Sequence, residues 1–160
     1  MKTIFIYGVL IALSVLTTSC FDDMEIKYDG PTQVEFETAV RTNPAVGRTY
    51  PLVGTANSLT ASPTITTQIN LVGPQRSGDL TVRVLPETTT TTAATRSYTL
   101  LNSGNVVIPA NTSFGSLSIA VSRATSATAA LANLVIVIDS TNTDYKASPN
   151  YRRIGYTIRQ

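Results

Sequence analysis

Two acidic side chains have the type and spacing that carboxylate catalysis could use. Glu35 and Glu37 are two residues apart in a segment of alternating apolar positions, so both are expected on one strand face, about 7 Å apart at their Cα atoms. In a retaining glycosidase the two carboxyl groups face each other across a cleft, about 5–5.5 Å apart. We therefore expect solvated carboxylates here, and we rank a hydrolase third among the possible functions.

The chain lacks the residue types that most other catalytic and metal sites require. It has no His and a single Cys, which excludes Ser-His-Asp and Cys-His catalysis, the common zinc sites and an intrachain disulfide. It also has no phosphate-binding Gly loop and no nucleophile elbow. The sequence thus predicts no catalytic residue, no metal, no cofactor and no enzymatic activity.

One segment combines aromatic side chains with cations. Tyr145 and Tyr151 flank a polar stretch, and Arg152 and Arg153 follow directly. Aromatic faces can stack on sugar rings or on cations, and loops on a rigid scaffold often carry binding residues. Tyr145, Tyr151 and Arg152 are therefore candidate ligand contacts; the alternative is that they only anchor the loop.

Strands are expected to position these residues, because apolar side chains recur at every second position in five segments. The expected inward residues are Val34, Phe36 and Val40; Ile65, Ile69 and Leu71; Leu80, Val82 and Val84; Leu117, Ile119 and Val121; and Ile154, Tyr156 and Ile158. Residues 134–138 are apolar throughout, which predicts a central strand. Gly, Pro and Asn separate the segments, so the pattern predicts an all-β antiparallel sandwich of about seven or eight strands.

Two connections are predicted from local sequence. Ser103-Gly104-Asn105 fits a tight hairpin turn that would join strand residues 98–100 to residues 106–108. Residues 88–92 are five consecutive threonines with no apolar alternation, which favours a surface loop over a strand.

The N-terminus has the layout of a secretory signal: a Lys at position 2, an apolar run over 4–16, and small residues before Cys20. About 13 apolar residues are too few for a membrane span, which needs about 20. The segment resembles a bacterial lipoprotein signal, in which cleavage precedes a lipid-modified Cys20. It departs from that pattern at Thr17, where the family usually has Leu. The resemblance implies membrane attachment through a lipid anchor on Cys20. The alternative is a lone buried thiol, or an ordinary signal peptide followed by a coincidental Cys.

Acidic residues follow Cys20 closely. Asp22, Asp23 and Glu25 resemble the export signal of surface lipoproteins in the Bacteroidota, which implies an outer-membrane protein exposed at the cell surface. The alternatives are a solvated tether and a periplasm-facing anchor. We expect a signal peptide over 1–19, the lipidated Cys and a linker over 20–32, and one sandwich domain over 33–160.

Residues 79–160 resemble small immunoglobulin-like domains of Bacteroidota lipoproteins. The matching segments are residues 79–86, 98–100, 107–113, 117–121 and 147–151. An Ile-Pro-Ala-x-x-Ser element within them also occurs in Calx-beta-like domains, but the acidic clusters that bind calcium there are missing here. The resemblance implies an Ig-like sandwich at the cell surface, of a kind often associated with glycan capture, and supplies no binding residues.

A second resemblance is shorter. Asp139-Ser140-Thr141 is similar to the O-glycosylation acceptor of exported Bacteroidota proteins, with Ser140 as the modified residue. The alternative is a chance match of three residues.

The net charge of the chain limits the classes of binding partner that we expect. The formal charge is +2, and the basic residues are scattered along the chain, which excludes an electrostatic footprint for nucleic acid. The leading expectation is a non-enzymatic surface lipoprotein that binds or presents an extracellular ligand, either a glycan or a protein. The alternative is a structural or assembly subunit that pairs through an edge strand with another outer-membrane protein.

Overall fold

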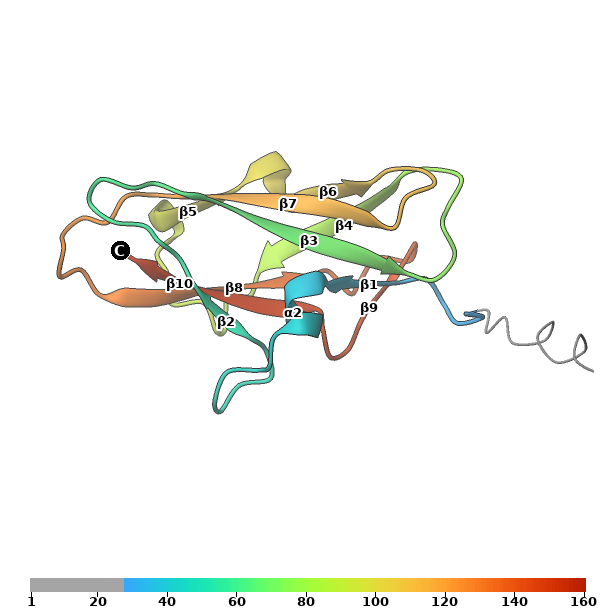
Figure 1. The fold of residues 1–160 in the computed structure, drawn as a ribbon, viewed down its shortest axis with the longest axis horizontal. Coiled ribbons are helices and arrows are strands. Elements are labelled where there is room, and N and C mark those ends of the chain that lie inside the picture. The colour runs from blue at the N-terminus through green and yellow to red at the C-terminus, as the bar shows by residue number, and fades with distance from the viewer. Residues whose placement is uncertain (1–27) are drawn as a thin grey trace, which may run out of the picture.

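The computed structural model describes residues 28–160, which form two facing β-sheets (Figure 1). The predicted lipidation site Cys20 and the acidic residues Asp22, Asp23 and Glu25 lie outside the described residues. The first strand begins at Gln33.

The two sheets have five strands each. Sheet A has the order β5 (Tyr98–Leu100), β7 (Phe114–Val121), β3 (Thr64–Val72), β1 (Gln33–Phe36), β9 (Lys146–Ala147). Sheet B has the order β2 (Leu52–Gly54), β10 (Arg153–Arg159), β8 (Leu131–Ile138), β4 (Leu80–Pro86), β6 (Asn105–Ile108). Neighbours are antiparallel except for the short pairs β1–β9 and β2–β10. The expected all-β sandwich is confirmed, with short edge strands added to those that the alternation revealed.

The core between the sheets consists largely of the alternating residues. The inward residues of β4, β7 and β10 are at most 3% exposed. Strand β8 lies between β10 and β4, and its residues 134–138, which are apolar throughout, are buried or half-buried on both faces. Ile136 faces the core, whereas Val135 lies on the opposite face and is still 0% exposed. The prediction of a central strand is confirmed.

The predicted hairpin is wrong. Strand β5 pairs with β7 in sheet A, and β6 pairs with β4 in sheet B, so the connection carries the chain from one sheet to the other. A short turn, η2 (Leu101–Gly104), makes this crossing with left-handed φ angles of 52° at Asn102, 55° at Ser103 and 79° at Gly104. A Cβ at Gly104 would lie 2.2 Å from the Val84 carbonyl oxygen, so only glycine fits there.

The five threonines at 88–92 form the expected loop. Beyond the end of β4, this part of the chain replaces β4 as the hydrogen-bonding partner of β8. The backbone N–H groups of Glu87 and Thr92 donate to the carbonyls of Val135 and Asn133, both at 2.8 Å. The Thr91 hydroxyl donates to the Val135 carbonyl and accepts from the Val135 N–H, both at 3.0 Å. This loop therefore covers part of the edge of β8 in place of a strand.

The strand around residue 36 ends earlier than predicted. Helix α2 (Glu37–Arg41) begins directly after β1, and Arg41 Nε lies 2.8 Å from Glu37 Oε1 across the turn. Val40 was expected in the core but is 45% exposed. In a helix, side chains no longer alternate between two faces, so Val40 does not point to the same side as Val34 and Phe36. A further short helical segment, η1 (Thr95–Ser97), directly precedes β5. Within residues 28–160, no helix has the length and apolar character to span a bilayer.

Candidate functional site

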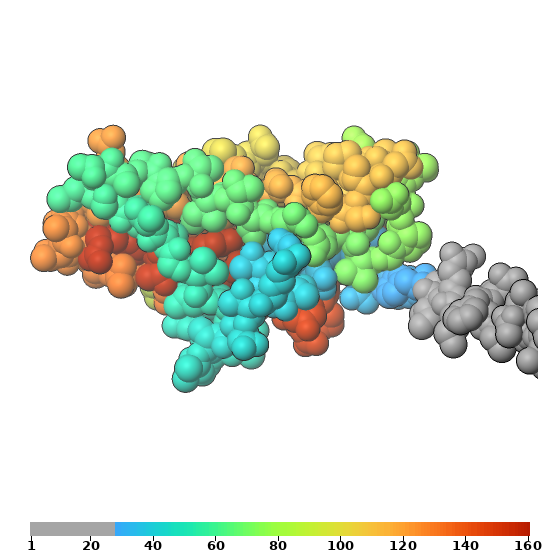
Figure 2. Space-filling model, in the orientation of Figure 1, coloured from blue at the N-terminus to red at the C-terminus, as the bar shows by residue number. Residues whose placement is uncertain are grey.

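A cleft of about 680 Å³ opens beside helix α2 and is the candidate functional site. Three segments contribute to its lining: residues 39–44 except Arg41, residues 48–51 except Tyr50, and residues 149–153. In the space-filling view the loop before β2 projects from the body of the sandwich beside α2, and the red segment that precedes β10 lies on the other side of α2 (Figure 2). The volume lies within the range of about 300–1,000 Å³ that is usual for small-molecule sites.

The β9–β10 loop forms one wall and is fixed to both sheets by backbone hydrogen bonds. Phe36 N donates to the Tyr151 carbonyl at 3.0 Å, and Ile138 N donates to the Arg152 carbonyl at 2.9 Å. Because Phe36 belongs to sheet A and Ile138 to sheet B, the backbone of this wall is held in place by the sandwich itself. The side chains of Tyr151 and Arg152 therefore extend from a rigid support.

The opposite wall is the loop that leads into β2. Ala45 N donates to the Tyr50 carbonyl at 3.0 Å, and Arg48 N donates to the Ala45 carbonyl at 2.9 Å, which closes the loop on itself. Gly47, at the tip, has a φ of +71° that favours glycine. This closed loop presents Arg48 and Thr49 to the cleft.

Tyr50 attaches that loop to the outer face of sheet B. Its side chain is 3% exposed, although it lies outside the main core. The ring packs over Gly155, where an added Cβ would lie 3.0 Å from Tyr50 Cε2. Gly155 pairs with Val135 on β8, and both lie on the face of sheet B that points away from sheet A. The missing side chain at Gly155 thus makes room for the ring.

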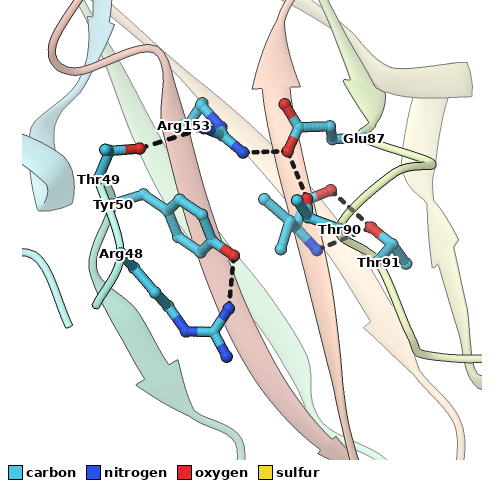
Figure 3. Close-up of polar contacts among 8 residues, drawn as sticks. Arg48, Thr49, Tyr50, Glu87, Thr90, Thr91 and Arg153 are labelled. Carbon is cyan, nitrogen blue, oxygen red and sulfur yellow. Dashed lines mark hydrogen bonds and ion pairs between the residues drawn. The ribbon is translucent and has the colours of Figure 1, made fainter. Parts of the chain in front are cut away.

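Two arginines flank the Tyr50 ring (Figure 3). The guanidinium carbon of Arg153 lies 4.7 Å from the ring centroid, and that of Arg48 lies 5.6 Å from it. Arg48 Nη1 also donates to the Tyr50 hydroxyl at 2.8 Å. Cation–π contacts of this kind contribute about 0.5–2 kcal/mol each, more where they are sheltered from water.

Arg153 is held from its other side by a carboxylate. It forms an ion pair with Glu87, whose carboxylate also accepts a hydrogen bond from the Thr90 hydroxyl (Figure 3). Arg153 Nη1 donates to Thr49 Oγ1 at 3.2 Å. The ion pair is largely shielded, with side-chain exposures of 23% for Arg153 and 22% for Glu87. Arg153 therefore links the loop before β2 to the loop after β4.

The lining of the cleft is cationic. It includes Arg48, Arg152 and Arg153 and contains no Asp or Glu. Arg153 is paired with Glu87, whereas neither Arg48 nor Arg152 has a carboxylate within 4.0 Å among residues 28–160. Within the same residues, Arg152 Nε is buried without a hydrogen-bond partner. The cleft thus holds positive charge that the described chain does not balance.

The structure brings together two of the three predicted ligand contacts. Tyr151, 37% exposed, and Arg152 line the cleft side by side. The prediction that Tyr145 is an exposed contact is wrong: its side chain is 2% exposed, and its hydroxyl accepts a hydrogen bond from Arg83 N at 3.2 Å. The residue lies just before β9, where the chain packs against the main core.

Sequence reasoning missed the contribution of the loop before β2. Arg48 and Tyr50 lie about one hundred residues from Arg152 and Arg153 along the chain, and no local pattern links the two segments. One signal was present: Arg153 falls on the outward parity of its predicted strand, so its side chain could not enter the core. That parity indicates a cation on the outer sheet face, but not what covers it.

Ser140 is exposed in a turn after β8. Asp139 Oδ1 accepts hydrogen bonds from Thr141 N at 2.9 Å and Thr141 Oγ1 at 2.7 Å, and these bonds hold the pKa of Asp139 below its usual value. The turn presents Ser140 to solvent, and its glycosylation stays a prediction. Among residues 28–160, no group of three His, Cys, Asp or Glu side chains is placed to hold a metal ion.

The two carboxylates considered for catalysis do not share a strand face. Glu35 lies in β1, whereas Glu37 begins α2 and pairs with Arg41. The expectation that they point the same way is therefore wrong, because the extended backbone ends between them. Glu35 is also partly buried, which raises the pKa of its carboxyl group.

The raised pKa of Glu35 predicts a pH-dependent effect of Glu35→Gln. Burial favours the neutral carboxyl, so the stability that Glu35 contributes is full below its unfolded-state pKa and is lost as pH rises through its folded-state pKa. We expect Glu35→Gln to raise the free energy of unfolding slightly at pH 7 and to leave it unchanged near about pH 3. Urea unfolding at both pH values measures this. Glu37→Gln is the matched control, with no gain expected at pH 7, and a gain from Glu35→Gln that is larger at low pH would contradict the assignment.

Comparison with solved structures finds the same sandwich in Bacteroides proteins. A proposed carbohydrate-binding protein from Bacteroides ovatus is similar with a TM-score of 0.52 and 9% identity, over 78% of this chain and 36% of that one. EndoBT-3987 from Bacteroides thetaiotamicron, solved with a Man5GlcNAc product, is similar with a TM-score of 0.52 and 10% identity, over 78% of this chain and 30% of that one. This chain thus spans about a third of the length of these proteins. No protein-family model and no curated protein matches the sequence.

Proposed function

We propose that this protein is a non-enzymatic lipoprotein of the outer membrane that binds an extracellular glycan in the cleft beside α2. The observation that carries the proposal is the cleft itself: one wall presents the exposed ring of Tyr151 and the guanidinium group of Arg152, and the opposite wall presents Arg48. Stacking on an aromatic face together with hydrogen bonds from polar side chains is the chemistry that a sugar ring requires.

The N-terminal residues support the location. Cys20 follows a signal-like segment, and a lipid on its sulfur would hold the sandwich at the membrane while the residues up to Gln33 act as a tether. The acidic residues Asp22, Asp23 and Glu25 favour transport to the cell surface. An Ig-like sandwich of this kind would then present its loops to the medium.

The fold comparisons support a role in glycan binding. The Bacteroides ovatus protein has a proposed carbohydrate-binding role, and EndoBT-3987 was solved with an oligosaccharide product. Neither likeness extends to binding residues at 9–10% identity, so the assignment of the cleft depends on the side chains of this chain.

Affinity electrophoresis of the lipoprotein, purified from membranes in detergent, tests the proposal with a panel of neutral and acidic polysaccharides. We expect at least one polysaccharide to retard the wild-type protein. Tyr151→Ala should weaken that binding about tenfold, because truncating an aromatic contact removes both area and stacking. Intact-mass measurement of the same sample should show acyl chains on Cys20.

Phe114→Ala is the matched control, because Phe114 is an aromatic residue with 55% exposure that lies on β7 outside the cleft. Equal weakening by Phe114→Ala and Tyr151→Ala would remove the cleft from the proposal. If no polysaccharide retards the protein and it co-purifies with another outer-membrane protein, the assembly role through an edge strand is favoured instead.

A further inference from the structure

Charge distinguishes this cleft from a site for neutral sugars. Of its lining residues, Arg48, Arg152 and Arg153 are cationic and none is acidic. A neutral saccharide needs no formal charge from its site, since hydroxyl groups are satisfied by amides, hydroxyls and backbone groups. Arg153 is paired with Glu87, but Arg48 and Arg152 have no carboxylate within 4.0 Å among residues 28–160, and these two guanidinium groups in one cleft point to a ligand with negative charge.

The three arginines are not equivalent. Arg153 is committed to the fold, because it pairs with Glu87, donates to Thr49 and stacks on Tyr50. Its charge is balanced by that carboxylate, and its side chain is only 23% exposed. Arg153 is therefore a positioning residue for the walls of the cleft.

Arg48 and Arg152 are the cations available to a ligand. Arg48 is exposed, and the one hydrogen bond from its side chain to a described residue, from Nη1 to the Tyr50 hydroxyl, orients the guanidinium group and leaves the other side-chain donors free. Arg152 is half-buried, and its backbone carbonyl is fixed by Ile138 N. Its Nε is buried, as is that of Arg153, so the terminal Nη groups of Arg152 are the donors that can face a ligand. A guanidinium group binds an oxyanion through two parallel N–H donors, which is the arrangement these side chains can offer.

Polar and aromatic groups surround these two cations. Tyr151 supplies a ring on the same wall as Arg152, and the exposed amides of Asn43 and Asn150 lie in the lining of both walls. An amide both donates and accepts hydrogen bonds, as sugar hydroxyls do. The site thus offers ring stacking and hydroxyl recognition next to oxyanion binding.

We infer that the cleft recognises an acidic saccharide, whose carboxylate or sulfate group is bound by Arg48 and Arg152 while a sugar ring stacks on Tyr151. This inference rests on the proposed glycan-binding function and names the class of glycan. Carboxylate and sulfate share the chemistry of an oxyanion on a sugar ring, so both are tested.

Four polymers separate the components of the inference in affinity electrophoresis of the detergent-solubilised lipoprotein: polygalacturonate, dextran sulfate, neutral dextran and polyglutamate. We expect retardation by polygalacturonate or dextran sulfate, and the tighter of the two identifies the oxyanion. Arg48→Gln and Arg152→Gln should each weaken that binding about tenfold or more, since each removes a charge-assisted pair. Arg48→Gln keeps the test open if Arg152→Gln fails to fold, because Arg48 is exposed.

Arg123→Gln is the matched control, because Arg123 is an exposed arginine between β7 and β8, outside the cleft. Equal weakening by Arg123→Gln would show diffuse attraction of a polyanion and overturn the inference. Binding to polyglutamate as strong as to the acidic polysaccharides would overturn the sugar component. Binding to dextran that is unaffected by Arg48→Gln would overturn the assignment of an acidic ligand and would leave the proposed glycan binding unchanged. If none of the polymers retards the protein, both the acidic ligand and the proposed glycan binding are overturned.

Discussion

Tyr145→Ala is expected to lower the free energy of unfolding by about 3–5 kcal/mol, the cost of deleting a buried aromatic ring. The Tyr145 side chain is 2% exposed and packs in the main core, although its neighbours Asp144 and Lys146 are exposed. The hydroxyl also accepts a hydrogen bond from Arg83 N at 3.2 Å. Removal of the ring therefore leaves a cavity and an unpaired backbone donor together. Urea unfolding followed by circular dichroism measures the change.

Two further tyrosine variants isolate the causes of this loss. Tyr145→Phe keeps the ring and removes only the acceptor for Arg83 N, so a loss of about 1 kcal/mol is expected. Tyr151→Ala is the exposed control and should stay within about 0.5 kcal/mol of the wild type. A loss from Tyr145→Ala no larger than that from Tyr151→Ala would contradict the packing of the segment before β9.

The alternation of apolar residues predicted the long strands correctly because each of these strands buries its own alternate side chains. Strands β4, β7 and β10 show this directly, and the unbroken apolar run of β8 identified a strand covered on both faces. The short strands β2 and β9 have two or three residues and carry no such pattern. Their conformation is set by pairing with β10 and β1, which is information that a local sequence window does not contain.

The misplaced hairpin has a similar cause. Asn102, Ser103 and Gly104 have the residue types of a tight turn, and all three do adopt positive φ angles. Turn chemistry specifies the backbone conformation but not the sheet that each flanking strand joins. Here β5 pairs with β7 and β6 pairs with β4, so the two strands that flank the turn belong to different sheets.

Only part of the candidate site could be predicted from the sequence. Tyr151 and Arg152 are adjacent in the chain, so their combination of ring and cation is a local signal. Arg48 reaches the same cleft only because Tyr50 packs over Gly155, a contact between residues more than one hundred positions apart. Tyr145 was predicted to be exposed because its neighbours in the sequence are polar. Its side chain is buried because it packs against core residues that are distant in the sequence.

Tyr50→Ala is expected to lower the free energy of unfolding by about 3–5 kcal/mol and to abolish the proposed glycan binding in the cleft. The ring is 3% exposed, contacts both Arg48 and Arg153, and covers Gly155 on the outer face of sheet B. Its removal exposes that face and leaves Arg48 without the hydroxyl that orients it. Urea unfolding measures the loss of stability, and affinity electrophoresis measures the loss of binding.

Tyr50→Phe separates these two effects. The ring and its contacts with Arg153 remain, so the free energy of unfolding should fall by only about 1 kcal/mol, the usual contribution of one hydrogen bond. The orientation of Arg48 is lost all the same, because its Nη1 no longer has an acceptor at 2.8 Å. A weaker affinity for the acidic saccharide in a protein that is nearly as stable as the wild type would assign Tyr50 a positioning role. Unchanged affinity in Tyr50→Phe would instead mean that Arg48 reaches the ligand without that hydroxyl, and that the ring contributes to binding only by holding the loop on sheet B.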